Sequence, residues 1–248
     1  EIYLNRAGEF ERATDLFGME NTRGMWGALY LADLNKDGIK DLIAGNVGTN
    51  SFYQTGMGMW VADFDQNGRQ DQIFTYQING EDYPIHDKDE LSQQLPYLKK
   101  NRLLYADYST ATVEKLLGQS ALEGSTHYRL NLITTSAWLF DGDKFTAFAL
   151  PNELQYAHIQ AITESDQNKD GVNDLLFGGN QSLIKPRFGA SDGSSGWAIP
   201  GGKQGYLFQQ MPLPLGVKGN IRAISPIKTK AGNRTIFGIN NQKISILP

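Results

Sequence analysis

A nine-residue acidic pattern occurs three times in this chain of 248 residues and constrains its fold more than any other feature. The copies begin at Asp33, Asp63 and Asp166, and each reads D-x-[DN]-x-[DN]-G-x-x-D followed by a short apolar run. Oxygen-bearing side chains therefore recur at positions 1, 3, 5 and 9, and the Gly at position 6 permits a sharp bend. Such self-similarity predicts several copies of one structural unit.

The spacing of the oxygen donors predicts three calcium loops. Ca²⁺ accepts about 6–8 oxygen ligands in flexible geometry, whereas Mg²⁺ keeps more of its water and is the weaker candidate. The carbonyl at position 7 would add a ligand, and water or a bidentate carboxylate would complete each shell. The expected ligands are Asp33, Asn35, Asp37, the Ile39 carbonyl and Asp41; Asp63, Asp65, Asn67, the Arg69 carbonyl and Asp71; and Asp166, Asn168, Asp170, the Val172 carbonyl and Asp174.

Charge supports a bound cation in these loops. Each loop would bring three carboxylates together, and like charges at short range repel strongly when no cation is present. Three Ca²⁺ ions would change the formal net charge of the chain from −4 to +2. The alternative is a surface turn rich in Asp and Asn, but a turn requires two or three such residues and not four at fixed alternation.

The residues around the loops argue against an EF-hand, which has a Glu at position 12 and a helix on either side. Position 12 is occupied by Ala44, Phe74 and Phe177. The flanking segments are short apolar runs that favour strands and have no helical periodicity. We therefore expect each loop to join two strands.

With these loops the chain resembles the FG-GAP/VCBS repeat family, which includes the calcium-binding β-propeller repeats of integrin α-chains. It is most similar to the large exported bacterial VCBS-repeat proteins. Gly45-Asn46 and Gly179-Asn180 stand where repeats of this family usually carry Gly-Asn, and the likeness extends from about Gly24 to Leu247.

The resemblance implies an all-β fold in which residues 1–248 form a β-propeller segment of about four blades. The last repeat, from about Gly219, has no acidic loop and should be metal-free. The family also implies structural Ca²⁺, a non-enzymatic role in protein interaction or adhesion, and a place outside the bacterial cell or at its outer membrane. Because both ends of the chain read as strands, we expect a piece of a longer protein or a ring closed by its two ends.

The spacing of the repeats predicts an insertion between the second and third copies. The first two loops begin at residues 33 and 63, whereas the third begins only at residue 166. The excess falls at residues 82–125, where Asp87 followed by Glu90 predicts a helix that begins with a capping box. Further helices are expected over Tyr97–Tyr105 and from about Thr110 to Gly118.

Composition excludes several classes of function. Lys and Arg total 23 against 27 Asp and Glu, so the chain lacks the basic surface of a duplex nucleic-acid binder. No apolar run is long enough to span a membrane, and the absence of Cys excludes disulfides and thiolate zinc sites. The three His residues are scattered, and spare acids such as Asp82 and Glu164 show no spacing that pairs them. We therefore expect no catalytic residues and no enzyme.

Two regions are candidates for recognising a partner, because loops that project from a rigid scaffold often carry function. One is the insertion, and the other is the Gly- and Ser-rich segment from Pro186 to Gly205. Aromatic side chains there could stack on sugar rings or anchor a protein contact. The candidate partner-binding residues are Tyr97, Tyr105, Arg187 and Trp197, with Lys99, Lys100 and Arg102 beside the tyrosines.

The sequence leaves two kinds of partner open, and each implies a different function for this chain. The first is a scaffold that binds a protein at the cell surface. The alternative is a carbohydrate-binding, lectin-like propeller associated with glycan uptake, for which Trp197 would be the sharpest probe.

Overall fold

The computed structural model describes residues 1–101, 104–230 and 232–248. Strands account for 38% of the structure, the helices are few and short, and every strand pairing is antiparallel. None of the sheets in the described residues closes on itself. The chain is therefore all-β, as the sequence predicts. In the same part of the chain, no helix is both long enough and apolar enough to cross a membrane.

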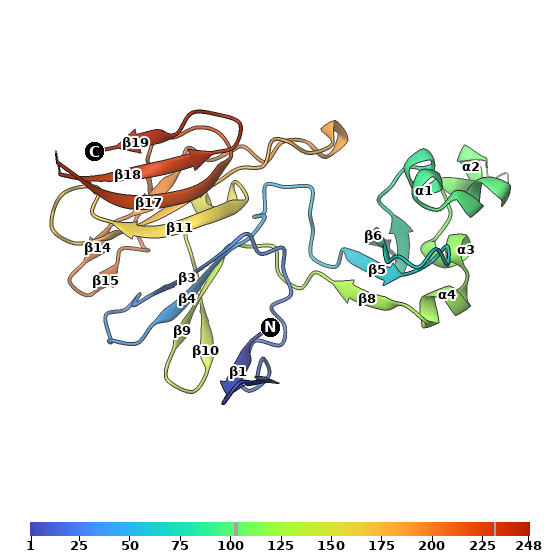
Figure 1. Cartoon of the computed structure of the whole chain (residues 1–248), viewed down its shortest axis with the longest axis horizontal. Coiled ribbons are helices and arrows are strands. Elements are labelled where there is room, and N and C mark those ends of the chain that lie inside the picture. The colour runs from blue at the N-terminus through green and yellow to red at the C-terminus, as the bar shows by residue number, and fades with distance from the viewer. Residues whose placement is uncertain (102–103, 231) are drawn as a thin grey trace. The chain divides into compact units, whose positions relative to one another are not determined.

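The chain divides into two compact units. The first comprises Glu1–Tyr53 with Leu132–Pro248, and the second comprises Gln54–Asn131. The second unit is inserted in the sequence between strands β4 and β9, which pair with each other in one sheet of the first unit (Figure 1).

Three larger sheets make up most of the first unit. The first has the order β10-β9-β4-β3, the second β11-β12-β13-β16 and the third β17-β18-β19. Their strands are β3 (Ala28–Ala32), β4 (Asp41–Gly45), β9 (Ser136–Phe140) and β10 (Phe145–Phe148); β11 (Ile159–Ser165), β12 (Asp174–Gly179), β13 (Trp197–Ile199) and β16 (Leu213–Pro214); and β17 (Ile221–Thr229), β18 (Gly232–Ile239) and β19 (Ser245–Leu247). Two small hairpins, β1 (Tyr3–Arg6) with β2 (Glu9–Arg12) and β14 (Gly201–Gly202) with β15 (Gly205–Tyr206), and the 3-10 turns Asn152–Gln155 and Pro186–Phe188 complete the unit.

Apolar side chains pack the first sheet against the second and the second sheet against the third. The largest buried cluster lies between the first two sheets, where Ile43 of β4 and Phe177 of β12 are fully buried. A second cluster lies between the second and third sheets, around Ile221 and Phe237. Strand β11 consequently lies beside both β3 and β17.

The acidic loops join neighbouring antiparallel strands, as the sequence predicts. They connect β3 to β4, β5 to β6 and β11 to β12, and the pairs closest to the loops are Ala32 with Asp41, Ala62 with Asp71 and Ser165 with Asp174. The apolar runs on both sides of each loop therefore become the strands that hold it.

The second unit combines one sheet with the helical segment. The sheet has the order β7-β6-β5-β8, and its face is covered by helices that share a core with Ile73. Its elements are β5 (Gly58–Ala62), β6 (Asp71–Ile78), β7 (Glu81–Pro84) and β8 (Thr126–Arg129), the helices α1 (Lys88–Gln94), α2 (Tyr105–Tyr108), α3 (Val113–Leu117) and α4 (Gln119–Glu123), and the 3-10 helix η1 (Pro96–Asn101).

The helical segment expected at residues 82–125 contains these helices, but the compact unit around it is larger. Strand β8 follows the helices and pairs with β5, which precedes them. This long-range pairing gives the sheet and the helices one common core, so the second acidic loop belongs to this unit as well. Of the helix expected over Tyr97–Tyr105, residues 102 and 103, including Arg102, lie outside the described residues.

The predicted capping box is present at the start of α1. The Asp87 carboxylate accepts a hydrogen bond from the Glu90 backbone N–H at 2.8 Å, and the Glu90 carboxylate accepts from the Asp87 N–H at 3.4 Å. Both interactions are local in sequence, which explains why the pattern alone could predict them.

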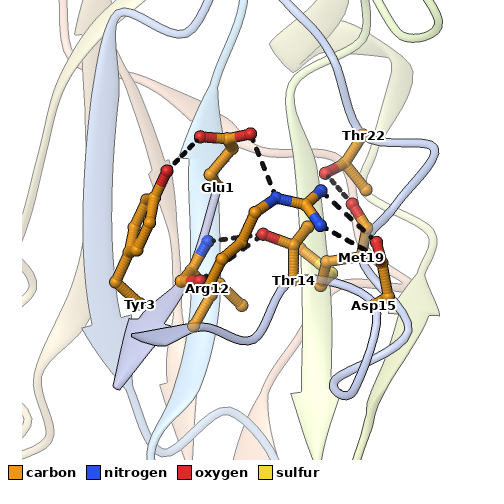
Figure 2. Close-up of polar contacts among 8 residues, drawn as sticks. Glu1, Tyr3, Arg12, Thr14, Asp15, Met19 and Thr22 are labelled. Carbon is orange, nitrogen blue, oxygen red and sulfur yellow. Dashed lines mark hydrogen bonds and ion pairs between the residues drawn. The ribbon is translucent and has the colours of Figure 1, made fainter. Parts of the chain in front are cut away.

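The N-terminal hairpin is held to the chain that follows it by one arginine (Figure 2). Arg12 donates to Glu1 at 3.2 Å and to Asp15 at 2.9 Å, and Tyr3 donates to the other oxygen of Glu1. These groups are exposed, so we expect the network to contribute little to stability. Met19, which follows this network in the chain, packs on the buried Trp138 of β9.

The core between the first two sheets gives a stability prediction. Phe177→Ala should lower the free energy of unfolding of the first unit by about 3–5 kcal/mol, because it removes a fully buried ring and leaves a cavity. Chemical denaturation of the whole chain measures this loss. Leu183→Ala is the control, since Leu183 is 62% exposed and should change stability by no more than about 0.5 kcal/mol. Equal effects of the two substitutions would show that this cluster is not the core of the unit.

Candidate functional site

The three acidic loops share one backbone conformation. Position 4 is left-handed in each, with φ values of 62° at Lys36, 59° at Gln66 and 62° at Lys169. Position 6 is also left-handed, with φ values of 89°, 85° and 88° at Gly38, Gly68 and Gly171. A Cβ at these glycines would meet no atom within 4 Å, so glycine is required there for its backbone freedom and not for space.

The carboxylate at position 1 organises each loop. In the first loop, Asp33 accepts from the backbone N–H of Asp37 at 3.1 Å and of Gly38 at 3.0 Å, and Asp37 accepts from the N–H of Ile39 at 2.8 Å. The corresponding bonds recur in the second loop at 2.9, 2.7 and 2.9 Å and in the third at 3.1, 3.0 and 2.8 Å. The side-chain oxygens at positions 1 and 5 therefore turn toward the inside of the bend.

The aspartate at position 9 ties the first loop to the sheet. Asp41 is fully buried, and its Oδ2 accepts from the Leu34 N–H at 2.8 Å, which closes the loop. Its Oδ1 accepts from the N–H of Phe140 in β9 at 2.8 Å. Burial raises the pKa of Asp41, while the two backbone N–H groups act in the opposite direction.

The same anchor recurs in the other two loops. Asp174, which is 2% exposed, accepts from the Gln167 N–H and from the N–H of Gly201, both at 3.0 Å. In the second loop, Asp71 accepts from the Phe64 N–H at 3.1 Å, and its second oxygen accepts from the side chain of Gln94 in α1 at 3.4 Å. The second donor to the position 9 carboxylate therefore differs between the loops. It comes from strand β9 in the first loop, from helix α1 in the second and from the β14 hairpin in the third.

The residues present fit a hard divalent cation. Asp63, Asp65 and Asp71 each offer a carboxylate oxygen, and these atoms lie within 4.8 Å of one another. In the first and third loops an Asn replaces the Asp at position 3, so an amide oxygen takes the place of one carboxylate there. A carboxylate has about four acceptor sites, so the backbone bonds leave lone pairs for an ion. A cation held by these groups would supply positive charge and rigidity to the loop.

The four residues expected to bind a partner lie apart in the chain and differ in their surroundings. Tyr97 packs against the helical core of the second unit, where burial raises its pKa. Tyr105 is 64% exposed and donates to Asp89. Arg187 is exposed and lies over the ring of Phe188 at 4.7 Å, whereas Trp197 is half-buried beside the core between the first two sheets.

Two of the spare acids, Asp82 and Glu164, are held by neighbouring donors. Asp82 accepts from Arg129 through both oxygens at 3.1 Å and from the Trp60 indole at 2.9 Å. Glu164 accepts from the hydroxyl groups of Tyr30 and Tyr206, and burial followed by this contact raises the pKa of Tyr206. Each carboxylate has a structural environment, and the two lie in different units.

Two cavities in the first unit flank the segment that the sequence singled out. The Phe52–Phe188 cavity, of about 310 Å³, lies between residues 47–53 and 181–191 and includes His158 in its wall. The Trp197 cavity, of about 470 Å³, is lined by Trp197, Asp192 and Lys218 among others. A backbone bridge pairs Gln181 with Ser191. The two chain segments that it joins each contribute residues to both cavities. Sequence reasoning found this segment but missed residues 47–53, because nothing local in them indicates a cavity.

His158 is neutral in the folded protein. Burial and, second, the charge of Arg222 lower its pKa to about 4. Its Nδ1 lies 2.9 Å from the Gln160 amide nitrogen, which can only donate, so Nδ1 accepts and Nε2 carries the proton. Nε2 faces Gly27, where a Cβ would come within 2.6 Å of it.

No protein-family model matches the chain, and no curated protein or solved structure matches it significantly. The resemblance to FG-GAP/VCBS repeats therefore stays a prediction from the sequence motifs.

The position 9 anchor predicts a stability effect that does not require metal. In EDTA, Asp41→Ala should lower the free energy of unfolding by about 2–5 kcal/mol, because it leaves two backbone N–H groups without their acceptor. Asp37→Ala, at an exposed position of the same loop, should change it by no more than about 1 kcal/mol. Chemical denaturation of both variants in EDTA measures the difference. Equal losses, or no loss in either variant, would contradict the anchoring role.

His158 predicts part of the pH dependence of stability. Its pKa is lower in the folded chain, so between the usual value of 6.5 and about 4 the unfolded chain binds the proton that the folded chain does not. Stability should therefore fall as the pH falls, by on the order of 1–2 kcal/mol from this group between pH 7 and pH 5.

The measurement is chemical denaturation at both pH values in EDTA, for the wild type and for His158→Gln. The variant should lose this part of the slope, because the two proteins differ only at residue 158. Identical slopes would show that His158 is not held neutral by the fold.

Proposed function

We propose that this chain is a calcium-stabilised, non-enzymatic β-propeller scaffold for protein interaction or adhesion at the bacterial cell surface. The observation that carries the proposal is the repetition of one loop geometry at three places, with oxygen donors at the same positions each time. Turns that merely reverse the chain do not require this agreement over nine residues.

Calcium would act on folding stability in this proposal. Each loop carries three carboxylates, which repel one another until a cation compensates them. An ion that binds only the folded loop adds its binding free energy to stability, about 2.7 kcal/mol at a concentration 100 times the dissociation constant. Because the backbone bonds already hold the loops in shape, little ordering remains to be done when the ion binds.

The packing of the sheets supports a propeller. Four sheets of three or four antiparallel strands are present, and in the first unit consecutive sheets pack face against face through buried clusters. Their first strands, β3, β11 and β17, follow one another along one side of this stack. Blades of a propeller are arranged in this way around an axis.

An exposed aromatic face in the second unit supports the interaction role. On β6, alternate residues face away from the helical core, and Phe74, Tyr76 and Ile78 are 36%, 37% and 48% exposed. Tyr128 of β8 is 39% exposed, and Tyr83 of β7 stacks on Tyr76. Aromatic groups on a flat sheet surface are typical of places where another protein binds.

The proposed location follows from calcium affinity. Extracellular calcium modules bind with dissociation constants of about 10⁻⁴–10⁻³ M, which suits loops that are mostly exposed at positions 3 to 7. Such sites would be filled outside the cell, where calcium is abundant.

Calcium removal tests the proposal. Elemental analysis of protein dialysed against calcium should give three ions per chain, and EDTA should lower the melting temperature of both units. Asp37→Ala and Asp65→Ala should each remove one ion, the first weakening only the first unit and the second only the second unit. An absence of bound metal together with an unchanged melting curve in EDTA would overturn the structural role of calcium.

A further inference from the structure

The Phe52–Phe188 cavity has the size and the composition of a small-molecule site. Its volume of about 310 Å³ falls at the lower end of the range that such sites occupy, about 300–1,000 Å³. Two segments far apart in the sequence form it, so the folded first unit is required to create it.

Aromatic side chains form the apolar wall of this cavity. The rings of Phe52 and Phe188 stack with their centroids 4.2 Å apart, and Tyr53 meets Phe52 edge-on at 6.0 Å. Arg187 lies over Phe188 but is not among the lining residues, so its charge remains outside. The stacking of Phe52 on Phe188 connects residues 47–53 with residues 181–191 and so holds the aromatic wall in place.

Uncharged hydrogen-bonding groups form much of the remaining lining. They come from residues on both segments, namely Thr49, Asn50, Ser51, Tyr53, Gln181 and Ser191. The Gln181 side-chain oxygen Oε1 already accepts from Arg222, which leaves the side-chain NH₂ to donate to a ligand. Asn50 and Ser51 already donate to backbone carbonyls and Ser191 accepts from the His158 N–H, but the Asn50 side-chain oxygen can still accept and the Ser191 hydroxyl can still donate. A ligand with hydroxyl groups would use this remaining capacity, whereas an apolar ligand would bury it unpaired at a cost of about 1–3 kcal/mol per group.

Formal charge is absent from the lining. Among the described residues that line this cavity there is no Asp, Glu, Lys or Arg, and His158 is neutral in the folded chain. A phosphate, carboxylate or ammonium group would lose its hydration here and find no charged partner in the lining, because the neighbouring Arg222 guanidinium already donates to the Gln181 side-chain oxygen and to the Asn180 carbonyl. The neighbouring Trp197 cavity differs, since Asp192 and Lys218 line it.

We infer that the Phe52–Phe188 cavity binds a neutral carbohydrate. A sugar ring offers apolar C–H groups to the aromatic wall and hydroxyl groups to the amides and hydroxyls opposite. The sequence made Trp197 the candidate residue for a carbohydrate site. The present assignment places the sugar in the Phe52–Phe188 cavity instead of the Trp197 cavity. It goes beyond the scaffold role and does not depend on calcium.

Binding of sugars to the whole chain tests the inference. Saturation-transfer NMR and calorimetry, in calcium-containing buffer, would compare neutral hexoses and their short oligomers with glucuronic acid and glucose 6-phosphate. A neutral sugar should bind, and the charged analogue of the same ring should bind at least about tenfold more weakly.

Matched variants locate the site. Phe188→Ala should weaken binding by about tenfold or more, because it removes one of the three rings of the aromatic wall, the one supplied by the second segment. Leu183→Ala, on the same segment but outside both cavities, and Lys218→Ala, in the Trp197 cavity, should leave affinity within about twofold.

Three outcomes would overturn the inference. They are binding of no neutral sugar, equal or tighter binding of the charged analogue, and a loss of binding in Lys218→Ala but not in Phe188→Ala. A melting temperature within about 2 °C of the wild type shows that Phe188→Ala is folded. If that variant unfolds, Phe52→Leu, which keeps an apolar side chain, replaces it in the same comparison.

Discussion

The buried carboxylate at position 9 of the acidic loops is the contact on which the rest of the structure depends. Asp41 and Asp174 each accept one backbone N–H from their own loop and one from a neighbouring segment. One side chain thereby closes the loop and attaches it to the sheet. A buried carboxylate without these donors would be costly, so the loop and the sheet stabilise each other.

This arrangement combines two roles within one motif. Position 9 joins the loop to the fold, and Asp71 also offers an oxygen to the acidic triad, whereas positions 3 and 5 are exposed or half-exposed and are available to an ion. Asp71 shows that the anchor adapts to its surroundings, because Gln94 of α1 supplies its second donor. The same motif can therefore serve in a sheet covered by helices and in a stack of sheets.

The proposed functions use different parts of the molecule. The loops would respond to calcium, and the face around Tyr76 would contact a protein. The Phe52–Phe188 cavity would hold a neutral sugar through residues that belong to none of the acidic loops. In this proposal recognition would use one strand face of the second unit and, in the first unit, segments between the strands.

Local features were determined by the sequence itself. The bend at Gly38, the capping box of Asp87 and Glu90 and the strands beside each loop depend on residues close together in the chain, where pattern and conformation correspond directly. Only the tertiary structure decided which distant segments meet. The pairing of β5 with β8 makes residues 54–131 a separate unit, and the contact of Phe52 with Phe188 creates a cavity. Such contacts depend on how whole sheets and loops pack, and no short pattern in the chain encodes that packing.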